Sequence, residues 1–322
     1  MNTAGGFWKN KRVLVTGYEG FLGSNLTKAL IDSGAKTIGL DIKVRRKETI
    51  LSKQDLAKIM IIKGSVVDYR LICSILERYK INVIFHLAAE AIVGKSQKHP
   101  LKTFETNIRG TWNILEAGRH VKRTEAIIVA SSDKAYGSHD DLPYTEDTPL
   151  CGKHPYDVSK SCADLIAYTY FNAYGLPVAV TRCGNIYGPG DFNFSRLVPD
   201  AIRCALKGRQ FIIRSDGKFT RDYIYVEDVV NGYMLLAERM KKLKLYGEAF
   251  NFSDENPITV IEIVKKIYDL TGKKPNYKVL NEAKYEIKHQ YLSSKKARKI
   301  LGWKPEHKLK QGLSKTIKSF YA

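Results

Sequence analysis

Between residues 12 and 182, short apolar runs alternate with longer segments in which apolar residues recur at helical spacing. The runs are five to seven residues long, and most are rich in β-branched residues, as buried strands are. This alternation is typical of an α/β protein with a doubly wound parallel sheet, and we predict that fold. The predicted strands are residues 12–16, 37–41, 60–64, 83–89, 126–130 and 178–182. Helices are predicted between them at residues 24–33, 71–79, 101–117 and 156–174, and the last two carry apolar residues on more than one side.

The pattern loses this regularity after residue 182. Residues 185–196 are rich in Gly, Asn, Pro and Asp, which predicts a long loop. We therefore expect two domains: residues 1–182, which build the sheet and also receive parts of residues 211–244, and residues 183–322, which mainly form a smaller C-terminal lobe. Beyond the loop, helices are predicted at residues 197–207, 229–239, 259–271 and 293–301, and strands at residues 211–214 and 249–253.

A glycine-rich turn joins the first strand to the first helix. Gly17, Gly20 and Gly23 have the spacing G-x-x-G-x-x-G. In a Rossmann-type sheet, such a turn brings backbone N–H groups and a helix N-terminus against a pyrophosphate. Asp41 ends the second strand, where a carboxylate binds the adenosine ribose hydroxyls and repels a 2′-phosphate, so the pattern favours NAD over NADP. The basic residues that follow Asp41 are interpreted as a solvated run of charge.

Two titratable residues near the next strands have ordinary explanations. Asp68 follows the third strand, where its carboxylate would either accept the adenine amino group or cap the next helix. His86 lies inside the fourth strand, and we interpret it as a core histidine whose ring nitrogens are satisfied.

Polar residues follow the fifth strand. Ser132, Asp133 and Lys134 come just after residues 126–130, and open parallel sheets bind ligands beyond the carboxyl ends of their strands. Tyr156 and Lys160 are four apart in a predicted helix and so share one face. An ammonium near a phenol favours the phenolate, which would let Tyr156 take a proton near neutral pH. Alone, either feature could be a polar turn or a chance pairing; together they favour catalysis.

The composition is that of an ordinary soluble globular protein with a net charge of +20. No apolar run reaches the ~18 residues of a membrane span, and the five cysteines are widely spaced without a Cys-x-x-Cys pair. We therefore expect a cytoplasmic protein without a membrane contact, a disulfide frame or a metal site. The lysines are scattered and are not interleaved with aromatic residues, so we expect anionic small molecules as partners and no nucleic acid.

Five motifs stand in order between residues 15 and 228. They are Val15-Thr16-Gly17-x-x-Gly20-Phe21-Leu22-Gly23, His86-Leu87-Ala88-Ala89, Ser131-Ser132 with Tyr136-Gly137, Pro155-Tyr156-x-x-x-Lys160 and Arg221-Asp222-Tyr223-x-Tyr225-Val226-x-Asp228. Together they resemble the extended short-chain dehydrogenase/reductases that act on nucleotide sugars, and within these the nucleoside-diphosphate-hexose 4,6-dehydratases. The resemblance runs from about residue 7 to residue 320. Ser132-Asp133-Lys134 and the opening Phe7-Trp8 are similar to the CDP-glucose enzymes. The segment from Arg182 to Pro189 is similar to the dTDP-glucose enzymes, so the nucleotide base stays open.

The resemblance implies that NAD⁺ oxidises carbon 4 of a nucleoside-diphosphate hexose, with Tyr156 as base, Lys160 tuning it and Ser132 bonding the oxygen. Water would then leave across carbons 5 and 6, with Asp133 as acid and Lys134 as base, and the hydride would return to carbon 6. These last roles need a protonated Asp133 and a neutral Lys134. Burial would favour both states, and a mutual ion pair would oppose both.

The resemblance also implies the binding residues and a homodimer. In the family, the helices that correspond to residues 101–117 and 156–174 pair across a two-fold axis. Substrate-binding residues would be Ser96, Asn185, Arg196 and Arg221. Cofactor-binding residues would be Gly17, Gly20, Phe21, Leu22, Gly23, Asp41, Asp68, Leu87, Ala88, Ala89, Tyr156 and Lys160.

Two alternatives stay open. A nucleotide-sugar 4-epimerase would use the same Tyr156, Lys160 and Ser132, but it needs no acid–base pair at Asp133 and Lys134. A catalytically inactive basic binding protein on the same fold would have lost some of these residues, and this chain keeps all of them.

Overall fold

The computed structural model describes residues 6–45, 48–283 and 287–321. The chain forms two compact units. The first, here called the sheet unit, comprises Met1–Gly137, Pro149–Arg182 and Val230–Phe250. The second, called the C-terminal unit, comprises Ser138–Thr148, Cys183–Val229 and Asn251–Ala322.

A seven-stranded sheet forms the centre of the sheet unit. Its strands are β1 (Arg12–Thr16), β2 (Lys36–Asp41), β3 (Met60–Lys63), β4 (Val83–His86), β5 (Ala126–Ala130), β6 (Val178–Cys183) and β11 (Ala249–Phe252). They lie in the order β11-β6-β5-β4-β1-β2-β3, and the pairings from β3 to β6 are all parallel. The doubly wound parallel sheet predicted from the sequence is confirmed. Its strand order reverses direction between β1 and β4, which is where such sheets open a crevice for ligands.

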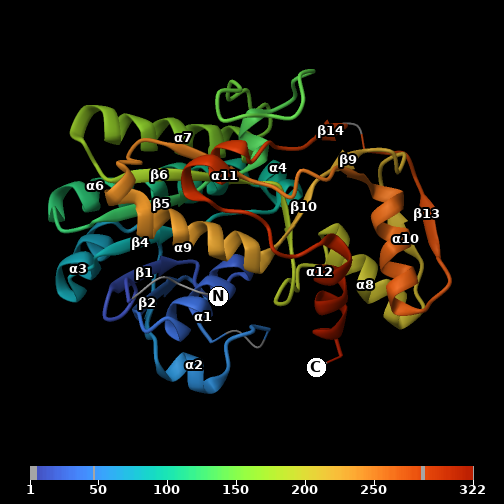
Figure 1. The fold of residues 1–322 in the computed structure, drawn as a ribbon, viewed down its shortest axis with the longest axis horizontal. Helices are drawn as coiled ribbons and strands as arrows, with labels where there is room; N and C mark the ends of the chain where they lie inside the picture. Colours follow the sequence, from blue (N-terminus) through green and yellow to red (C-terminus); the bar gives the residue numbers. More distant parts are fainter. Residues whose placement is uncertain (1–5, 46–47, 284–286, 322) are drawn as a thin grey trace. The chain divides into compact units, whose positions relative to one another are not determined.

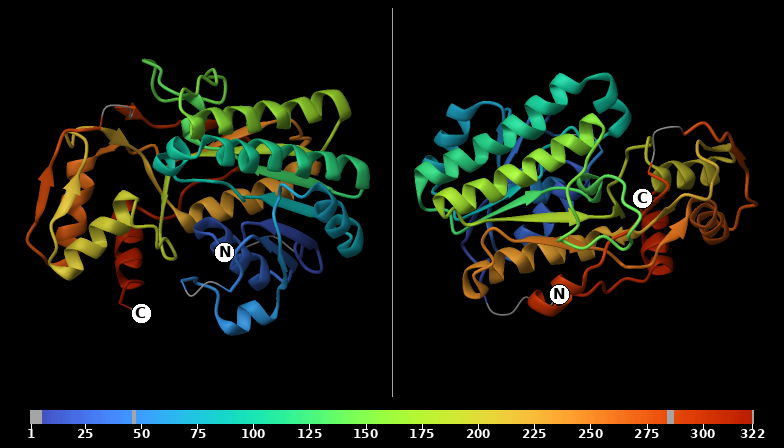
Figure 2. Two further views of the ribbon diagram at one scale, coloured as in Figure 1. Left: turned by 180° about the vertical axis from the view of Figure 1, so that it is seen from behind. Right: turned by 90° about the horizontal axis from the view of Figure 1, so that it is seen from above.

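Helices cover both faces of this sheet. Figure 1 shows α1 and α9 on the near side, and the view from behind in Figure 2 shows α6 and α7 side by side on the other. On that second face, Leu14, Ile84 and Ile127 of the strands form one core with apolar residues of α3, α6 and α7. The helices of this unit are α1 (Phe21–Asp32), α2 (Lys53–Ala57), α3 (Tyr69–Tyr79), α4 (Val93–Lys98), α5 (Pro100–Phe104), the π-helical turn η1 (Glu105–Arg109), α6 (Gly110–Val121), the 3₁₀ turn η2 (Asp133–Tyr136), α7 (Pro155–Tyr174) and most of α9 (Val226–Leu243).

Short strands and three longer helices make up the C-terminal unit. Its core joins Tyr187 and Phe211 to apolar residues of α8, α10 and α12, which stand together in Figure 1. Strand β7 pairs with β10, β12 and β14 flank β9, and β8 pairs with β13. The elements are β7 (Asn185–Tyr187), α8 (Leu197–Lys207), β8 (Phe211–Ile213), β9 (Thr220–Arg221), β10 (Tyr223–Tyr225), β12 (Ile258–Thr259), α10 (Val260–Thr271), β13 (Tyr277–Val279), β14 (His289–Gln290), α11 (Lys295–Leu301) and α12 (Leu309–Lys318).

Several predicted boundaries were wrong. The first helix begins at Phe21, three residues early, because the glycine-rich turn already has helical geometry there. The segment expected as a loop at residues 185–196 opens with β7, whose partner β10 lies far along the chain and leaves no local signal. The helix predicted at residues 229–239 extends over Val226–Leu243. The helix predicted at residues 101–117 is interrupted by η1, which contains one wide turn.

Candidate active site

The glycine-rich turn lies against the segment that follows β4. Gly17 has φ +72°, and a Cβ there would stand 3.1 Å from both the Cα and the N of Ala88. A Cβ on Gly23 would stand 2.0 Å from the carbonyl oxygen of Gly17. Gly20 is the N-cap residue of α1, so no side chain caps the first N–H groups of that helix. These groups therefore suit a pyrophosphate that approaches the bare turn.

A chain of hydrogen bonds fixes the two sides of this cradle. The Thr16 hydroxyl oxygen accepts the backbone N–H groups of Leu87 and Ala88 at 3.1 Å each, so its proton is directed to Nδ1 of His86 at 2.9 Å. Nε2 of His86 then donates to Oγ1 of Thr111 at 3.2 Å. Burial, together with the charge of Lys160, lowers the pKa of His86 to about 3. The prediction of a satisfied core histidine is confirmed.

The other predicted cofactor residues occupy different environments. Asp41 is buried at the end of β2, and its Oδ1 accepts the backbone N–H of Lys43 at 3.0 Å. Asp68 is exposed and accepts the N–H of Leu71 at 3.0 Å, which confirms the capping role; an adenine contact stays a prediction. Ser96 is buried, and its hydroxyl has no hydrogen-bond partner among the described residues. A hydroxyl in that state is costly to leave unpaired, so it has bonding capacity for a ligand.

Tyr156 and Lys160 lie in the first turns of α7, which starts with Pro155 at its first position. Lys160 is buried, and its Nζ donates to the carbonyl oxygen of Ala130, the last residue of β5, at 2.7 Å. Burial lowers the pKa of Lys160 to about 8, while the Asp164 carboxylate opposes this shift. Only about 9% of Tyr156 is exposed. The helix therefore presents a phenol and a buried ammonium at the carboxyl end of the sheet.

Ser132, Asp133 and Lys134 form the start of η2. Ser132 caps this turn: its hydroxyl oxygen accepts the backbone N–H of Lys134 at 3.2 Å, and its proton goes to Oδ1 of Asp133 at 3.0 Å. Nζ of Lys134 is 3.3 Å from Oδ2 of Asp133, with side-chain exposures of 19% and 4%. The mutual ion pair that would oppose a protonated Asp133 and a neutral Lys134 is thus present.

Sequence reasoning missed the clamp that holds η2 to α7. Arg182, at the end of β6, binds Asp164 of α7 through Nε at 2.9 Å and Nη2 at 2.7 Å. Its Nη1 also donates to the phenol oxygen of Tyr136 in η2 at 2.8 Å. All three side chains are buried. The available signal was an arginine inside an apolar strand, which needs a buried acid as partner.

Asn107 was also missed. It lies in η1, and its side-chain amide donates to the Ser159 hydroxyl of α7 at 2.9 Å and to the carbonyl of Glu90 at 3.2 Å. Its Oδ1 accepts the N–H of Glu90 at 2.8 Å. One buried amide thus ties the segment after β4 to the helix that carries Tyr156 and Lys160.

A second acid stands at the start of α7. Asp157 is buried, and its Oδ2 is 3.2 Å from Nδ1 of His154, the N-cap residue. Burial raises the pKa of Asp157, while the bond from His154 and the charge of Lys134 lower it. Neither residue was predicted, although an acid in the first turn of a helix is a known sequence signal.

The predicted diphosphate ligands lie in the C-terminal unit. Asn185 begins β7, and Arg196 is the N-cap residue of α8, where its Nη1 pairs with Oδ2 of Asp191 at 3.2 Å. Nη1 of Arg221 donates to the carbonyl oxygens of Thr220 at 2.8 Å and Lys288 at 3.0 Å. The other predicted site residues, including Ser96, belong to the sheet unit.

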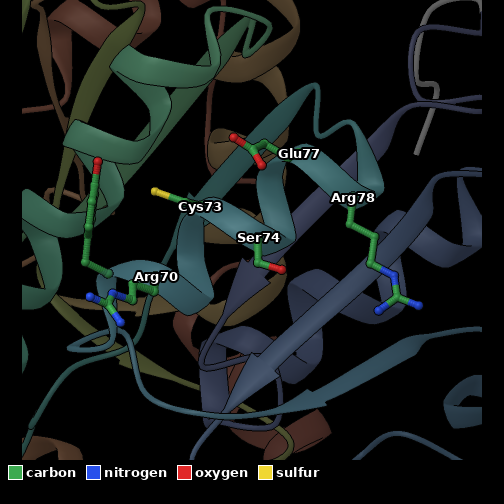
Figure 3. A pocket seen from close by; sticks show the side chains of 6 residues that line it. Arg70, Cys73, Ser74, Glu77 and Arg78 are labelled. Atoms are coloured by element: carbon green, nitrogen blue, oxygen red, sulfur yellow. The ribbon is translucent and has the colours of Figure 1, made fainter.

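A surface hollow of about 610 Å³ runs along α3, and Figure 3 shows its side chains. None of the predicted site residues lines it; the lining residues are Tyr69, Arg70, Cys73, Ser74, Glu77 and Arg78. In the parts of the chain that the structure describes, no helix has the length and apolar character needed to cross a bilayer. No cluster of three or more His, Cys, Asp or Glu in those parts could hold a metal ion.

Known proteins resemble this chain along nearly its whole length. A family model described as GDP-mannose 4,6 dehydratase matches residues 14–316. A CDP-glucose 4,6-dehydratase from Salmonella typhimurium is 32% identical over 329 residues, covering 97% of this chain and 91% of that protein. A UDP-glucuronate 4-epimerase from Thermodesulfobacterium geofontis is 30% identical over 323 residues, covering 94% of each. The crystal structure of a dTDP-glucose 4,6-dehydratase from Bacillus anthracis in complex with NAD has a TM-score of 0.86 at 28% identity, covering 97% of this chain and 96% of that one.

Dehydratases and epimerases are thus similar to this chain at nearly the same identity, so identity alone does not choose between the two reactions. The superfamily itself is settled, because the family model and these relatives span nearly the whole chain. The chain belongs to the GDP-mannose 4,6-dehydratase family, which confirms the resemblance to the extended short-chain dehydrogenase/reductases and the prediction of an enzyme.

Proposed function

We propose that this enzyme is an NAD-dependent nucleotide-sugar 4,6-dehydratase, which converts a nucleoside-diphosphate hexose to its 4-keto-6-deoxy derivative. The observation that carries this choice is the Asp133–Lys134 pair, 3.3 Å between Nζ and Oδ2, next to Ser132. An elimination needs one group that takes a proton and another that gives one. An epimerase, which only oxidises and re-reduces carbon 4, has no use for such a pair.

The cradle of the sheet unit fits NAD. The turn at Gly17, Gly20 and Gly23 and the bare N-terminus of α1 would hold the pyrophosphate, and Asp41 would bind the ribose hydroxyls. Phe21, Leu22, Asp68 and the segment Leu87-Ala88-Ala89 would complete the contacts. NAD supplies, when bound, the acceptor of the hydride from carbon 4 and the donor of the hydride to carbon 6.

Tyr156 would take the proton of the carbon-4 hydroxyl. Lys160 has a pKa of about 8 and is therefore mostly charged at neutral pH. Its ammonium would stabilise the phenolate form of Tyr156, which is the form that accepts the proton. Ser132 would donate a hydrogen bond to the carbon-4 oxygen once substrate displaces its bond to Asp133. Losing water across carbons 5 and 6 is then the task of Asp133 and Lys134.

The C-terminal unit would bind the rest of the substrate. Arg196 and Arg221 suit a diphosphate because a guanidinium forms paired bonds with phosphate oxygens, and Asn185 and Ser96 would add polar contacts. In this proposal, residues 1–182 carry the cofactor and the chemistry, and residues 183–322 mainly bind the nucleotide sugar. The cytoplasmic location stays a prediction.

We also propose a homodimer. Leu101 is 80% exposed, and Leu165 and Tyr168 of α7 are each 56% exposed. Large apolar side chains at such exposure favour burial against a second copy, and a two-fold dimer would use one self-complementary patch. Light scattering at micromolar concentration should give the mass of two chains.

Product analysis tests the proposed reaction. The enzyme is incubated with CDP-, dTDP-, GDP- or UDP-glucose, and the nucleotide sugars are measured by mass spectrometry. Loss of one water from one of them supports the dehydratase. An isomer of unchanged mass would overturn it in favour of the epimerase. Tyr156→Phe is the matched control and should leave every substrate unchanged.

A further inference from the structure

Hydrogen-bond donors face both carboxylate oxygens of Asp133. Oδ1 accepts the hydroxyl proton of Ser132 at 3.0 Å, and Oδ2 faces Nζ of Lys134 at 3.3 Å. Ser132 can direct its only proton to Asp133 because its oxygen already accepts the backbone N–H of Lys134. A protonated carboxyl group would need an acceptor for one of its oxygens. Donors to both oxygens stabilise the ionised carboxylate.

Lys134 interacts electrostatically with two carboxylates. Asp133 is in direct contact, and the charge of Lys134 also acts on Asp157, which His154 holds at the start of α7. Opposite charges in direct contact favour the ion pair over a neutral pair. Asp133 and Asp157 are buried, but their oxygens are compensated by bonds and by this ammonium. The elimination pair is therefore charged before it reacts.

We infer that the pair works in the sense opposite to the one implied by the family resemblance: the Asp133 carboxylate removes the carbon-5 proton, and the Lys134 ammonium protonates the leaving carbon-6 hydroxyl. This inference rests on the proposed 4,6-dehydratase function. It needs no prior proton exchange within the pair, because each group already holds the charge that its step requires.

The protons and electrons balance. The carbon-5–hydrogen bond breaks and its proton goes to Asp133, while its electron pair forms the bond between carbons 5 and 6. The carbon-6–oxygen bond breaks, and the departing hydroxide takes a proton from Lys134 and leaves as water. When carbon 6 has received the hydride, carbon 5 takes back the proton of Asp133. Lys134 regains a proton from water, and Tyr156 releases to water the proton that it took from the carbon-4 hydroxyl group.

Hydrogen exchange at carbon 5 separates the two assignments. The 4-keto-6-deoxy product, made by the wild-type enzyme, already has an acidic carbon-5 proton and no leaving group. It is returned to each enzyme variant in D₂O, and deuterium at carbon 5 is measured by NMR against a sample without enzyme. This readout reports the base alone.

The expected outcome differs between the two residues. Asp133→Asn should slow exchange by about 10²–10⁴-fold, the usual cost of losing a positioned base. Lys134→Arg should exchange within a few-fold of the wild type, since a guanidinium stays charged and cannot act as a base, yet it should dehydrate substrate at least about 10²-fold more slowly. Exchange lost in Lys134→Arg and kept in Asp133→Asn would overturn the inference, as would equal losses in both.

Two controls keep this test decisive. Asp133→Glu restores a carboxylate and should recover part of the exchange, which a variant damaged in folding would not do. Each variant should still reduce its cofactor when the sugar nucleotide is added, because carbon-4 oxidation uses Tyr156 and Lys160. Failure of the proposed function has a different signature, since the wild-type enzyme itself would then remove no water from any of the four substrates.

Discussion

Two lysines of the sheet unit, Lys134 on η2 and Lys160 on α7, differ in what surrounds them. Lys134 keeps 19% of its side chain exposed and pairs with a carboxylate. Lys160 is buried and bonds a neutral carbonyl oxygen, and burial lowers its pKa to about 8. The ammonium of Lys134 is thus stabilised by an opposite charge, whereas the ammonium of Lys160 is destabilised by its loss of solvation. A lysine meant to give up a proton to a leaving group and a lysine meant to tune a phenol need not share an environment.

The largest expected difference between η2 and α7 is the reaction step that fails when a residue of each is replaced. Tyr156→Phe should abolish carbon-4 oxidation, so neither reduced cofactor nor product should form. Lys134→Ala should still reduce the cofactor but release the 4-keto-6-deoxy product about 10²–10⁴-fold more slowly, or roughly 3–5 kcal/mol of barrier. Stopped-flow absorbance of the reduced cofactor and mass spectrometry of the product separate the two. If Lys134→Ala dehydrates near the wild-type rate, this lysine is structural.

The clamp between the two regions should carry a large stability effect. Arg182→Met leaves Asp164 charged and unpaired in a buried site, which should cost about 3–5 kcal/mol of unfolding free energy. Arg182→Met combined with Asp164→Leu should cost less than the single change, because no buried charge is then left alone. Urea denaturation followed by circular dichroism measures both. A single variant that loses under about 1 kcal/mol would mean that the pair does not hold η2 in place.

Replacing each lysine by methionine should move stability in opposite directions. A fall in the pKa of Lys160 from 10.5 to about 8 corresponds to about 3 kcal/mol. Lys160→Met removes that cost but also loses the bond to Ala130, worth about 1 kcal/mol, so it should stabilise the fold by about 1–2 kcal/mol at pH 7. Lys134→Met leaves the Asp133 carboxylate without its ion pair and should destabilise by about 1–3 kcal/mol. Urea denaturation at pH 7 measures the free energy of unfolding of both variants. If both variants were stabilised, or both destabilised, the proposed difference between the two lysine environments would be wrong.

The stability difference between the wild type and Lys160→Met should depend on pH. The unfolded chain keeps the proton of Lys160 up to about pH 10.5, whereas the folded chain loses it near pH 8. Between these values the unfolded state binds more protons, so wild-type stability should gain from this group as pH rises. The advantage of Lys160→Met should therefore be full below pH 8 and should vanish above about pH 10.5. A constant difference across that window would contradict the burial of this ammonium.

The smallest effect concerns the second carboxylate near Lys134. Asp157→Asn keeps the shape of the side chain and removes a charge that supports the ammonium, so elimination should slow by only a few-fold at pH 7. Carbon-4 oxidation should be unchanged. His154→Gln, which keeps a donor for Asp157, is the matched control and should have a smaller effect. The ratio of reduced cofactor to released product measures both.

Much of the sheet unit was predictable because its signals are local. The strand patterns, the glycine turn with Asp41, and Tyr156 four residues before Lys160 each depend on neighbours within one or two elements. The clamp was not predictable, since Arg182 lies 18 residues from Asp164 and 46 from Tyr136. The protonation of Asp133 and Lys134 also depends on how side chains are placed, which residue type alone does not determine. Most short strands of the C-terminal unit were missed for the same reason, as two- or three-residue pairings carry no periodicity; β8, predicted at residues 211–214, is the exception.

The π-helical turn at Glu105–Arg109 explains an ambiguity in the amino-acid pattern. A regular α-helix advances by about 100° per residue, and one extra residue in a turn shifts the phase of everything after it by about that angle. Counted as one regular helix, residues 101–117 place apolar side chains on several sides. When the segments before and after the π-helical turn are considered separately, the pattern is clear. Ile114 and Leu115, after the turn, are fully buried in the core, whereas Leu101, before the turn, is 80% exposed. Deleting one residue within this turn should therefore rotate one half of the helix relative to the other. If an alignment with a related sequence places a gap here, the apolar residues before and after the gap should lie on faces of the helix that are rotated relative to each other.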